Sequence, residues 1–302
     1  MYKLQHMNAL LFYLGLPFLY LISALPNRLF YALSNCLFFF FFHVSNYRRK
    51  VVQSNLRNAF PEKSEIERKH IEKKFYKYLC DLILESFRSL TKGESFFKTH
   101  CIFSDSAKKL FDHYASTDQS VILVMGHFGN WEWAGQSFSL NCRQKLFVIY
   151  RPLSNYYFNK LTNKMRSKFG TGLIEMKDAY KTMWTNKHLL TATAFIADQT
   201  PPPENAYWTL FMNQQTPVFW GTELLSKRLN FPIIYATVKR IKRGFYQIEA
   251  ETLLEKPQMT AEGEISESHT RKLETEIKNQ PELWLWSHRR WKHKPPSTFN
   301  KL

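Results

Sequence analysis

Cysteine is scarce in this sequence of 302 residues, and its copies are scattered. The four cysteines, which form no Cys-x-x-Cys pair and have no spacing typical of metal ligands, are Cys36, Cys80, Cys101 and Cys142. This pattern argues against a disulfide framework or a zinc ribbon, and it favours a reducing compartment for the folded part.

Acidic side chains are also in the minority: Asp and Glu total 25 against 42 Lys and Arg, which gives a formal net charge of +17. Such an excess attracts nucleic acids, anionic lipid surfaces, phosphorylated substrates or acidic proteins. The sequence contains no recognisable DNA- or RNA-binding motif, so nucleic acid is not expected as a partner. The 26 phenylalanines and an aromatic content of 16% are more typical of proteins near lipid.

Charged residues are absent from residues 7–27, and a second apolar stretch covers residues 29–47. A bilayer span needs roughly 20 apolar residues, so each stretch is marginal by itself. The basic "YRRK" at 47–50 follows as a cytoplasmic flank would. A secretory signal peptide or a buried helix pair would be the alternatives, but no basic n-region or small-residue cleavage site is present. We therefore predict a membrane anchor over residues 1–47, as a tilted span, a hairpin or an interfacial element.

Internal repeats and low-complexity linkers are missing, so residues 48–302 are predicted to form one catalytic domain. Apolar periodicity predicts a long helix over Ser64–Leu90 with a Ser64-x-x-Glu67 capping box, and strands that alternate with helices after it. This alternation indicates an α/β layered fold, with a central, mostly parallel (mixed) sheet flanked by helices and an antiparallel edge. The predicted strands are 121–125, 146–150, a short strand near 173, 190–197, 233–239 and 245–251. The predicted helices after the long one are 131–140, 155–169, 222–229 and 266–279, and two more that begin near 105 and near 178.

A histidine and a glutamate follow the first of these strands, in the stretch "VILVMGHFGNWEWAG" at 121–135. In α/β folds ligands gather at the carboxyl ends of strands, where His127 lies. Asn130 is a natural N-cap and Glu132 falls in the first helical turn. Residues five apart on one helix face about 140° away from each other, but His127 precedes the helix, so Glu132 can fold back onto the imidazole. A carboxylate partner makes a histidine a general base.

No serine or cysteine lies within this motif, and Gly-x-Ser-x-Gly is absent from the chain. A His127–Glu132 dyad without its own nucleophile would deprotonate a hydroxyl supplied by the substrate. A satisfied interior histidine beside a capping glutamate is the structural alternative. Because neither His-Glu-x-x-His nor a second ligand pair is present, we expect no metal, and we expect no cofactor.

The stretch "GHFGNWEWAG" resembles the His-x4-Asp/Glu signature of the glycerolipid and lysophospholipid acyltransferase superfamily. Its form is that of the late lipid A acyltransferases, the lauroyl and myristoyl transferases of endotoxin assembly. The resemblance covers nearly the whole chain. Its other segments are the apolar N-terminus, "RRKVVQSNLRNAFP" (48–61), "YRP" (150–152), "ADQ" (197–199) and "LWSHRRWK" (285–292). Each segment is weak by itself, but their order and spacing together are specific.

The resemblance implies an enzyme of the bacterial inner membrane whose catalytic domain lies on the cytoplasmic side. It would move a fatty acyl group from a thioester, usually acyl-acyl carrier protein, to a hydroxyl of a lipid A precursor or related glycolipid. His127 would be the base and Glu132 its partner, with Arg151 and Asp198 in supporting, substrate-binding roles. Arg151 and Asp198 both follow predicted strands. A surface arginine and a turn-forming aspartate are common at such positions without any role in binding, and this is the alternative interpretation. An acyltransferase acting on a lysophospholipid or another membrane lipid stays an alternative, as does a non-enzymatic membrane scaffold.

Three further segments allow two interpretations each. "FWGTELL" at 219–225 lines an acyl-chain pocket or belongs to the core. "KRIKR" at 239–243 binds phosphates or an acidic carrier protein, or is a solvated face. "HRRWKHK" at 288–294 has the same options, and the tryptophans at 284, 286 and 291 favour the membrane interface for it.

Overall fold

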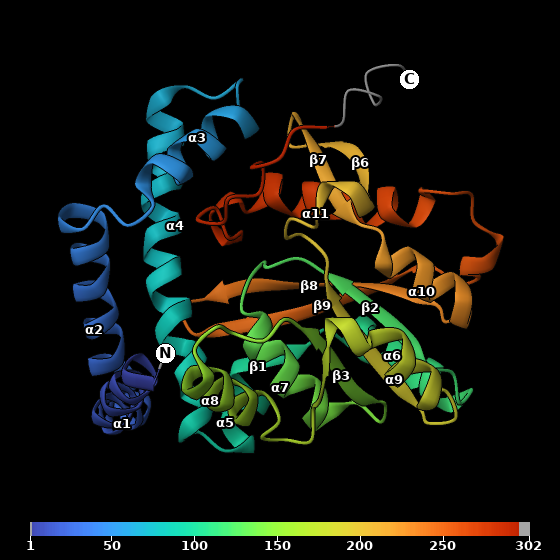
Figure 1. Cartoon of the computed structure of the whole chain (residues 1–302), viewed down its shortest axis with the longest axis horizontal. Helices are drawn as coiled ribbons and strands as arrows, with labels where there is room; N and C mark the ends of the chain where they lie inside the picture. Colours follow the sequence, from blue (N-terminus) through green and yellow to red (C-terminus); the bar gives the residue numbers. More distant parts are fainter. Residues whose placement is uncertain (1, 296–302) are drawn as a thin grey trace.

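A computed structural model describes residues 2–295 of the chain. Its centre is a seven-stranded sheet in the order β1-β9-β8-β2-β5-β3-β4 (Figure 1). β8, β2, β5, β3 and β4 run parallel, whereas β9 is antiparallel to β8 and parallel to β1. The predicted mixed, mostly parallel sheet is therefore confirmed. The strands are β1 (Cys101–Phe103), β2 (Val121–Met125), β3 (Lys145–Tyr150), β4 (Gly172–Glu175), β5 (Thr191–Ile196), β8 (Ile233–Lys242) and β9 (Phe245–Leu254).

Helices cover both faces of the sheet, as the side chains of β2 show. Successive strand residues point to opposite faces, and Val121 and Leu123 pack in a core cluster with α6 and α7. Ile122 and Val124 pack in another, with α9, α10 and α11. The helices of this part of the chain are α5 (Glu94–His100), α6 (Asp105–Ser116), α7 (Trp131–Asn141), α8 (Tyr156–Arg166), α9 (Ala179–Thr185), α10 (Gly221–Leu229) and α11 (Glu264–Asn279).

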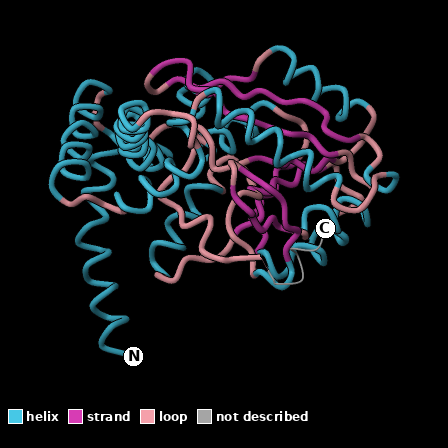
Figure 2. Tube along the Cα trace, turned by 90° about the horizontal axis from the view of Figure 1, so that it is seen from above, coloured by secondary structure: helices cyan, strands magenta, loops and turns pink. Residues whose placement is uncertain are grey.

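The N-terminal segment is helical, as predicted, and consists of α1 (Tyr2–Ala24), α2 (Asn27–Phe39) and a π-helix (Phe40–Val44). In Figure 2 the N-terminal half of α1 projects away from the rest of the molecule. No single helix in the described part of the chain is both long and apolar enough to cross a bilayer. One helix pair, Asn27–Val44 with Arg49–Ala59, passes the length and composition test together, but it bends by 85°. The expected transmembrane helix is thus not found as one helix, and the membrane anchor stays a prediction.

Two further helices connect the N-terminal segment to the sheet: α3 (Arg49–Ala59), which the sequence did not reveal, and α4 (Glu65–Ser86). The predicted capping box is confirmed, since the Ser64 hydroxyl accepts from the Glu67 amide and the Glu67 carboxylate accepts from the Ser64 amide. α2 packs on α4, where the Ser34 hydroxyl donates to buried Asp81 at 2.6 Å. The division at residue 47 into anchor and catalytic domain stays a prediction.

A hairpin of β6 (Ala206–Phe211) and β7 (Gln214–Phe219) was not predicted. Its turn is Met212–Asn213, and both residues have positive φ, 48° and 62°. Turns of this kind usually contain glycine, so this pair gave no turn signal.

The "KRIKR" segment is only partly a solvated face. Arg240 and Arg243 both form ion pairs with Asp81, at 2.7 and 2.6 Å. In "FWGTELL" both interpretations hold for different residues, because Phe219 lines a cavity whereas Leu225 is buried in the core.

Candidate active site

The loop between β2 and α7 holds His127 at the carboxyl end of β2. Gly129 in this loop has φ +62°, and a side chain there would meet the Val238 carbonyl oxygen at 1.9 Å. Only glycine fits at this position. Asn130 then caps α7, its side-chain oxygen accepting from the Trp133 amide at 3.0 Å. The close backbone approach and the cap together fix the position of His127.

Asp198 is the hydrogen-bonded partner of His127. β2 and β5 are neighbours with Met125 opposite Ile196, so the residues after these two strands meet. Nδ1 of His127 lies 2.6 Å from Oδ1 of Asp198, and the His127 backbone N–H donates to Oδ2 at 2.8 Å. The indole N–H of Trp284 also donates to Oδ2, at 2.8 Å. Three donors thus orient one buried carboxylate.

Burial alone would raise the pKa of Asp198. The nearby His127 and its two hydrogen bonds, with that of Trp284, outweigh burial and lower the pKa to about 2. An ionised carboxylate can only accept, so Nδ1 of His127 carries the shared proton. Nε2 therefore carries the lone pair, and this Nδ1–H tautomer is the one that a general base needs. Nε2 lies 3.2 Å from the side-chain nitrogen of Gln199.

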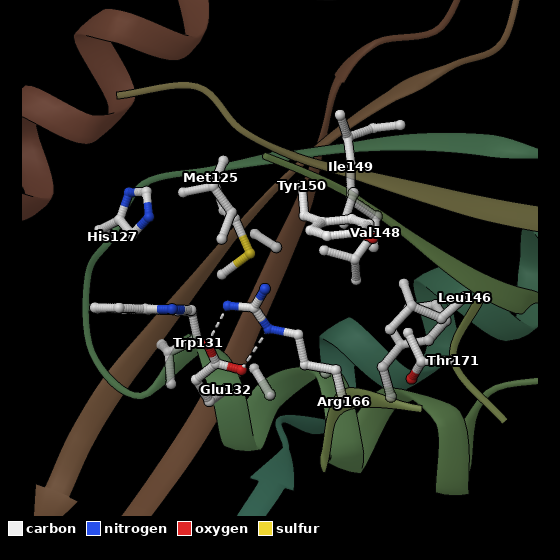
Figure 3. Close-up of a pocket in the computed structure, with 18 of the residues that line it drawn as sticks. Met125, His127, Trp131, Glu132, Leu146, Val148, Ile149, Tyr150, Arg166 and Thr171 are labelled. Atoms are coloured by element: carbon white, nitrogen blue, oxygen red, sulfur yellow. Dashed lines mark hydrogen bonds and ion pairs between the residues drawn. The ribbon is translucent and has the colours of Figure 1, made fainter. Parts of the chain in front are cut away.

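Glu132 lies in the first turn of α7, as predicted, but it does not fold back onto the imidazole. Within the described residues its carboxylate pairs with Arg166 of α8, which donates from Nε at 3.0 Å and from Nη2 at 2.5 Å (Figure 3). The predicted His127–Glu132 contact is therefore wrong. A two-point, charge-assisted interaction holds Glu132, while Asp198 already occupies Nδ1.

A mainly apolar cavity of about 270 Å³ opens beside His127, between the sheet and α7. Figure 3 shows His127 and Trp131 at one side of the cavity, with Leu146 and Thr171 at the other and the Glu132–Arg166 pair between them. Phe111 and Phe138 also line it. The Trp131 ring stands edge-on to the imidazole, with 4.9 Å between centroids. A long apolar chain would fit here with its polar end near the histidine.

Arg151 follows β3 and lines the same cavity as His127, with an exposed side chain. Arg151 and His127 therefore both lie at the carboxyl ends of parallel strands. The proposed role of Arg151 in substrate binding is a separate matter that stays a prediction.

A second buried carboxylate, Glu85 of α4, contacts the N-cap residue Asn130 of this loop. It accepts hydrogen bonds from Asn130 at 2.8 Å, from Tyr246 at 2.7 Å and from Tyr31 of α2 at 2.8 Å. Burial, together with the neighbouring charge of Asp81, raises the pKa of Glu85. The cap of α7 therefore depends on a side chain that also contacts the N-terminal helices.

Two of the three C-terminal tryptophans, Trp284 and Trp286, are buried in the core beside the site. Trp284 and Trp286 are 2% and 0% exposed, and a β-bridge pairs Trp284 with Phe128 of the loop. Trp291 is half-buried, and its indole donates to Thr216 at 2.7 Å. The expectation that these tryptophans lie at the membrane interface is wrong for Trp284 and Trp286.

The sequence interpretation missed Arg166 and Trp284 as site residues. Arg166 is one of many basic residues on a helix, and nothing in its spacing indicates Glu132 as a partner. Gln199 was available in the quoted "ADQ", beside Asp198, but without a role. In the described part of the chain, no group of three or more His, Cys, Asp or Glu side chains is placed to hold a metal ion.

Comparison with protein families finds one match over almost the whole length. The family model of bacterial lipid A biosynthesis acyltransferases matches residues 1–293. Comparison with individually curated proteins gives no match. The resemblance predicted from "GHFGNWEWAG" and its accompanying segments is thereby confirmed.

Proposed function

The chain belongs to the bacterial lipid A biosynthesis acyltransferase family, and on that basis we propose that it moves a fatty acyl group from acyl-acyl carrier protein to a hydroxyl of a lipid A precursor. The observation that carries this proposal is the His127–Asp198 pair beside a deep apolar cavity. The cavity suits an acyl chain, and the histidine suits activation of a hydroxyl.

In the proposed reaction Nε2 of His127 accepts the proton of the acceptor hydroxyl. The hydroxyl oxygen forms a bond to the thioester carbonyl carbon, and a tetrahedral intermediate with a negatively charged oxygen results. This intermediate collapses with cleavage of the C–S bond, and the imidazolium returns its proton to the departing sulfur. Asp198 holds Nδ1–H throughout and stabilises the imidazolium.

Two polar groups beside His127 are placed to assist. The Gln199 amide nitrogen is 3.2 Å from Nε2, so its N–H holds the Nε2 lone pair until the acceptor hydroxyl takes its place. Arg151, exposed where it lines the cavity, would bind a phosphate group of a substrate. Arg166 is already neutralised by Glu132, so in this proposal the pair shapes the wall of the acyl-chain cavity.

We place the enzyme on the cytoplasmic side of the bacterial inner membrane, held by the N-terminal helices. One face of α1 presents large apolar side chains that are each more than half exposed, namely Leu10, Leu14, Phe18 and Leu21. Their spacing of three to four residues makes a continuous stripe. α1 also stacks on α8 through Phe12 and Tyr157, whose ring centroids are 5.5 Å apart. An exposed apolar stripe next to the cavity-lining helix α8 favours attachment to lipid.

The proposal is tested with membranes that contain the protein, a labelled acyl-carrier-protein donor and a tetraacylated lipid A precursor. Wild-type protein should transfer the label, and His127→Ala should reduce the rate by orders of magnitude. His70→Ala on α4, an exposed histidine, is the control and should keep full activity. Equal activity in His127→Ala would contradict the mechanism, and transfer to a lysophospholipid alone would contradict the acceptor.

A further inference from the structure

One arginine of the C-terminal run "HRRWKHK" points inward. Arg290 is 2% exposed, whereas its neighbour Arg289 is exposed. The expectation of a basic run that binds phosphates or an acidic protein therefore does not apply to Arg290. A buried guanidinium is costly unless other groups compensate its charge, so its surroundings should indicate what it does.

The guanidinium is poorly paired. Nε and Nη1 of Arg290 are buried and have no hydrogen-bond partner among residues 2–295. Burial lowers the pKa of Arg290 to about 10, and the charge of Asp198 acts in the opposite direction. Arg290 thus stays charged at neutral pH.

Arg290 and Asp198 line the same small cavity, of about 10 Å³, together with Tyr235, His269 and Thr270. That volume is close to the space needed by one water molecule, and water in such a site needs two to four polar partners. His127 lines the large cavity and not this one. Asp198 therefore belongs both to the hydrogen bond with the imidazole and to the lining of the cavity that Arg290 shares.

The other titratable groups around Asp198 do not supply a lasting positive charge. Burial lowers the pKa of His269 on α11 to about 4, against the raising effect of Glu223 on α10. Burial likewise lowers the pKa of His288 to about 4. Tyr235 on β8 is neutral, because burial raises its pKa well above the ordinary value. Of these groups and Arg290, only Arg290 is a cation at neutral pH.

We propose that Arg290 is a positioning residue: through a water molecule in the small cavity, its positive charge adds to the hydrogen bonds of His127 and Trp284 on the Asp198 carboxylate and helps to hold the His127 proton on Nδ1. This inference rests on the proposed function for its meaning in catalysis. Without the guanidinium, protonation of the Asp198–His127 pair becomes easier. The rate should then fall, and the loss of activity on acidification should begin at a higher pH.

The test compares Arg290→Met and Arg290→Gln, which remove the charge, with Arg290→Lys, which keeps it, all in the full chain. Arg289→Met is the matched control. In the uncharged variants we expect kcat to fall about ten- to hundredfold, as when a supporting partner of a functional group is lost. KM should change little, the acid limb of the pH profile should move to higher pH, and both uncharged variants should still fold. Arg290→Lys should keep the wild-type acid limb.

A second measurement does not depend on turnover. NMR of ¹⁵N-labelled histidine in detergent micelles reports which imidazole nitrogen of His127 carries the proton. Wild type and Arg290→Lys should show the proton on Nδ1, and Arg290→Met should show a mixture of tautomers. If no acyl group is transferred but this tautomer shift occurs, the proposed function is wrong and the role of Arg290 stands.

Three results would overturn the proposal. The first is a wild-type pH profile and a wild-type His127 tautomer in the uncharged variants. The second is failure of both uncharged variants to fold, because the charge would then serve stability. The third is a change in KM alone, which would assign Arg290 to substrate binding.

Discussion

At the scale of single residues, the site is organised around Asp198. Its carboxylate accepts hydrogen bonds from the His127 imidazole, the His127 backbone N–H and the Trp284 indole. We expect Asp198→Asn to lower kcat by about 10³- to 10⁴-fold with little change in KM. The amide would present an N–H to Nδ1 and favour the wrong tautomer, an effect of this size in serine proteases. Steady-state kinetics would measure it, with Asp112→Asn, an exposed aspartate on α6, as the control. A loss confined to KM would contradict the assignment.

The same carboxylate affects stability at low pH. The pKa of Asp198 is lowered from 3.8 to about 2 in the folded chain. The ionised carboxylate therefore stabilises the fold at any pH above the ordinary pKa of an aspartate. This contribution, about 2 kcal/mol, is lost as the pH falls from about 4 to about 2. Denaturant unfolding at pH 5 and pH 2.5 should show a smaller drop for Asp198→Asn than for wild type. An identical drop would show that Asp198 is not responsible.

Glu132 and Arg166 should behave as one unit. Removing either partner leaves a partly buried charge without compensation, so Glu132→Gln and Arg166→Met should each lower the transfer rate. The double variant should be no slower than the slower single variant, and NMR should show the His127 tautomer unchanged in Glu132→Gln. Additive losses would contradict the pairing, and a changed tautomer would indicate a direct contact of Glu132 with His127.

The sequence predicts that Glu132 is the partner of His127, whereas the structure pairs His127 with Asp198 and Glu132 with Arg166. The predicted pairing rests on neighbourhood along the chain, whereas the partner of His127 is set by which strand lies beside β2. That strand is β5, far along the chain, and a strand order of this kind is not readable from local patterns. Trp284 has no local signal at all, because its role depends on a bridge to the loop at Phe128.

At the scale of elements, α7 runs along the cavity and sets its depth. Glu132 lies near the histidine, and Gly135 and Phe138 follow at intervals of one turn. An added Cβ at Gly135 would have only Leu146 nearby, at 3.9 Å, so there is room for a side chain. We expect Gly135→Leu to reduce transfer of the longest acceptable acyl chain by about tenfold or more relative to shorter chains.

This prediction is checked by competition between acyl donors of different length, with product analysis by mass spectrometry. Phe138→Ala should shift the preference in the opposite direction. Gly15→Leu on α1, where no atom lies within 4 Å of the added Cβ, is the control and should keep the wild-type preference. An unchanged preference in Gly135→Leu would contradict the location of the acyl chain.

Elements with strong local signals were predicted best. The predicted bounds of β2 and the predicted start of α7 agree with the structure to the residue. A run of apolar and β-branched residues ends at a glycine, and an asparagine N-cap follows. The β6–β7 hairpin was missed because its turn lacks glycine, and β1 because a strand of three residues has no periodicity. α3 has no start signal in the sequence, because its N-cap residue Arg48 makes no side-chain cap hydrogen bond.

At the scale of the whole molecule, the exposed stripe on α1 and the net charge of +17 both favour an anionic lipid surface. We expect Leu14→Glu with Leu21→Glu to release much of the protein from vesicles that contain anionic lipid. Ile66→Glu on α4, also at a strongly exposed apolar position, is the matched control. Flotation in a density gradient measures the bound fraction, and equal binding by both variants would show that α1 is not the anchor.

The bridge between Phe128 and Trp284 also has a meaning for the newly made protein. Trp284 and Arg290 come after every strand of the sheet in chain order, so a ribosome delivers them after the strands. The sheet can therefore assemble during translation while Asp198 still lacks its indole donor. Synthesis of the segment that follows α11 completes the site, so a growing chain is expected to stay inactive until this segment has emerged.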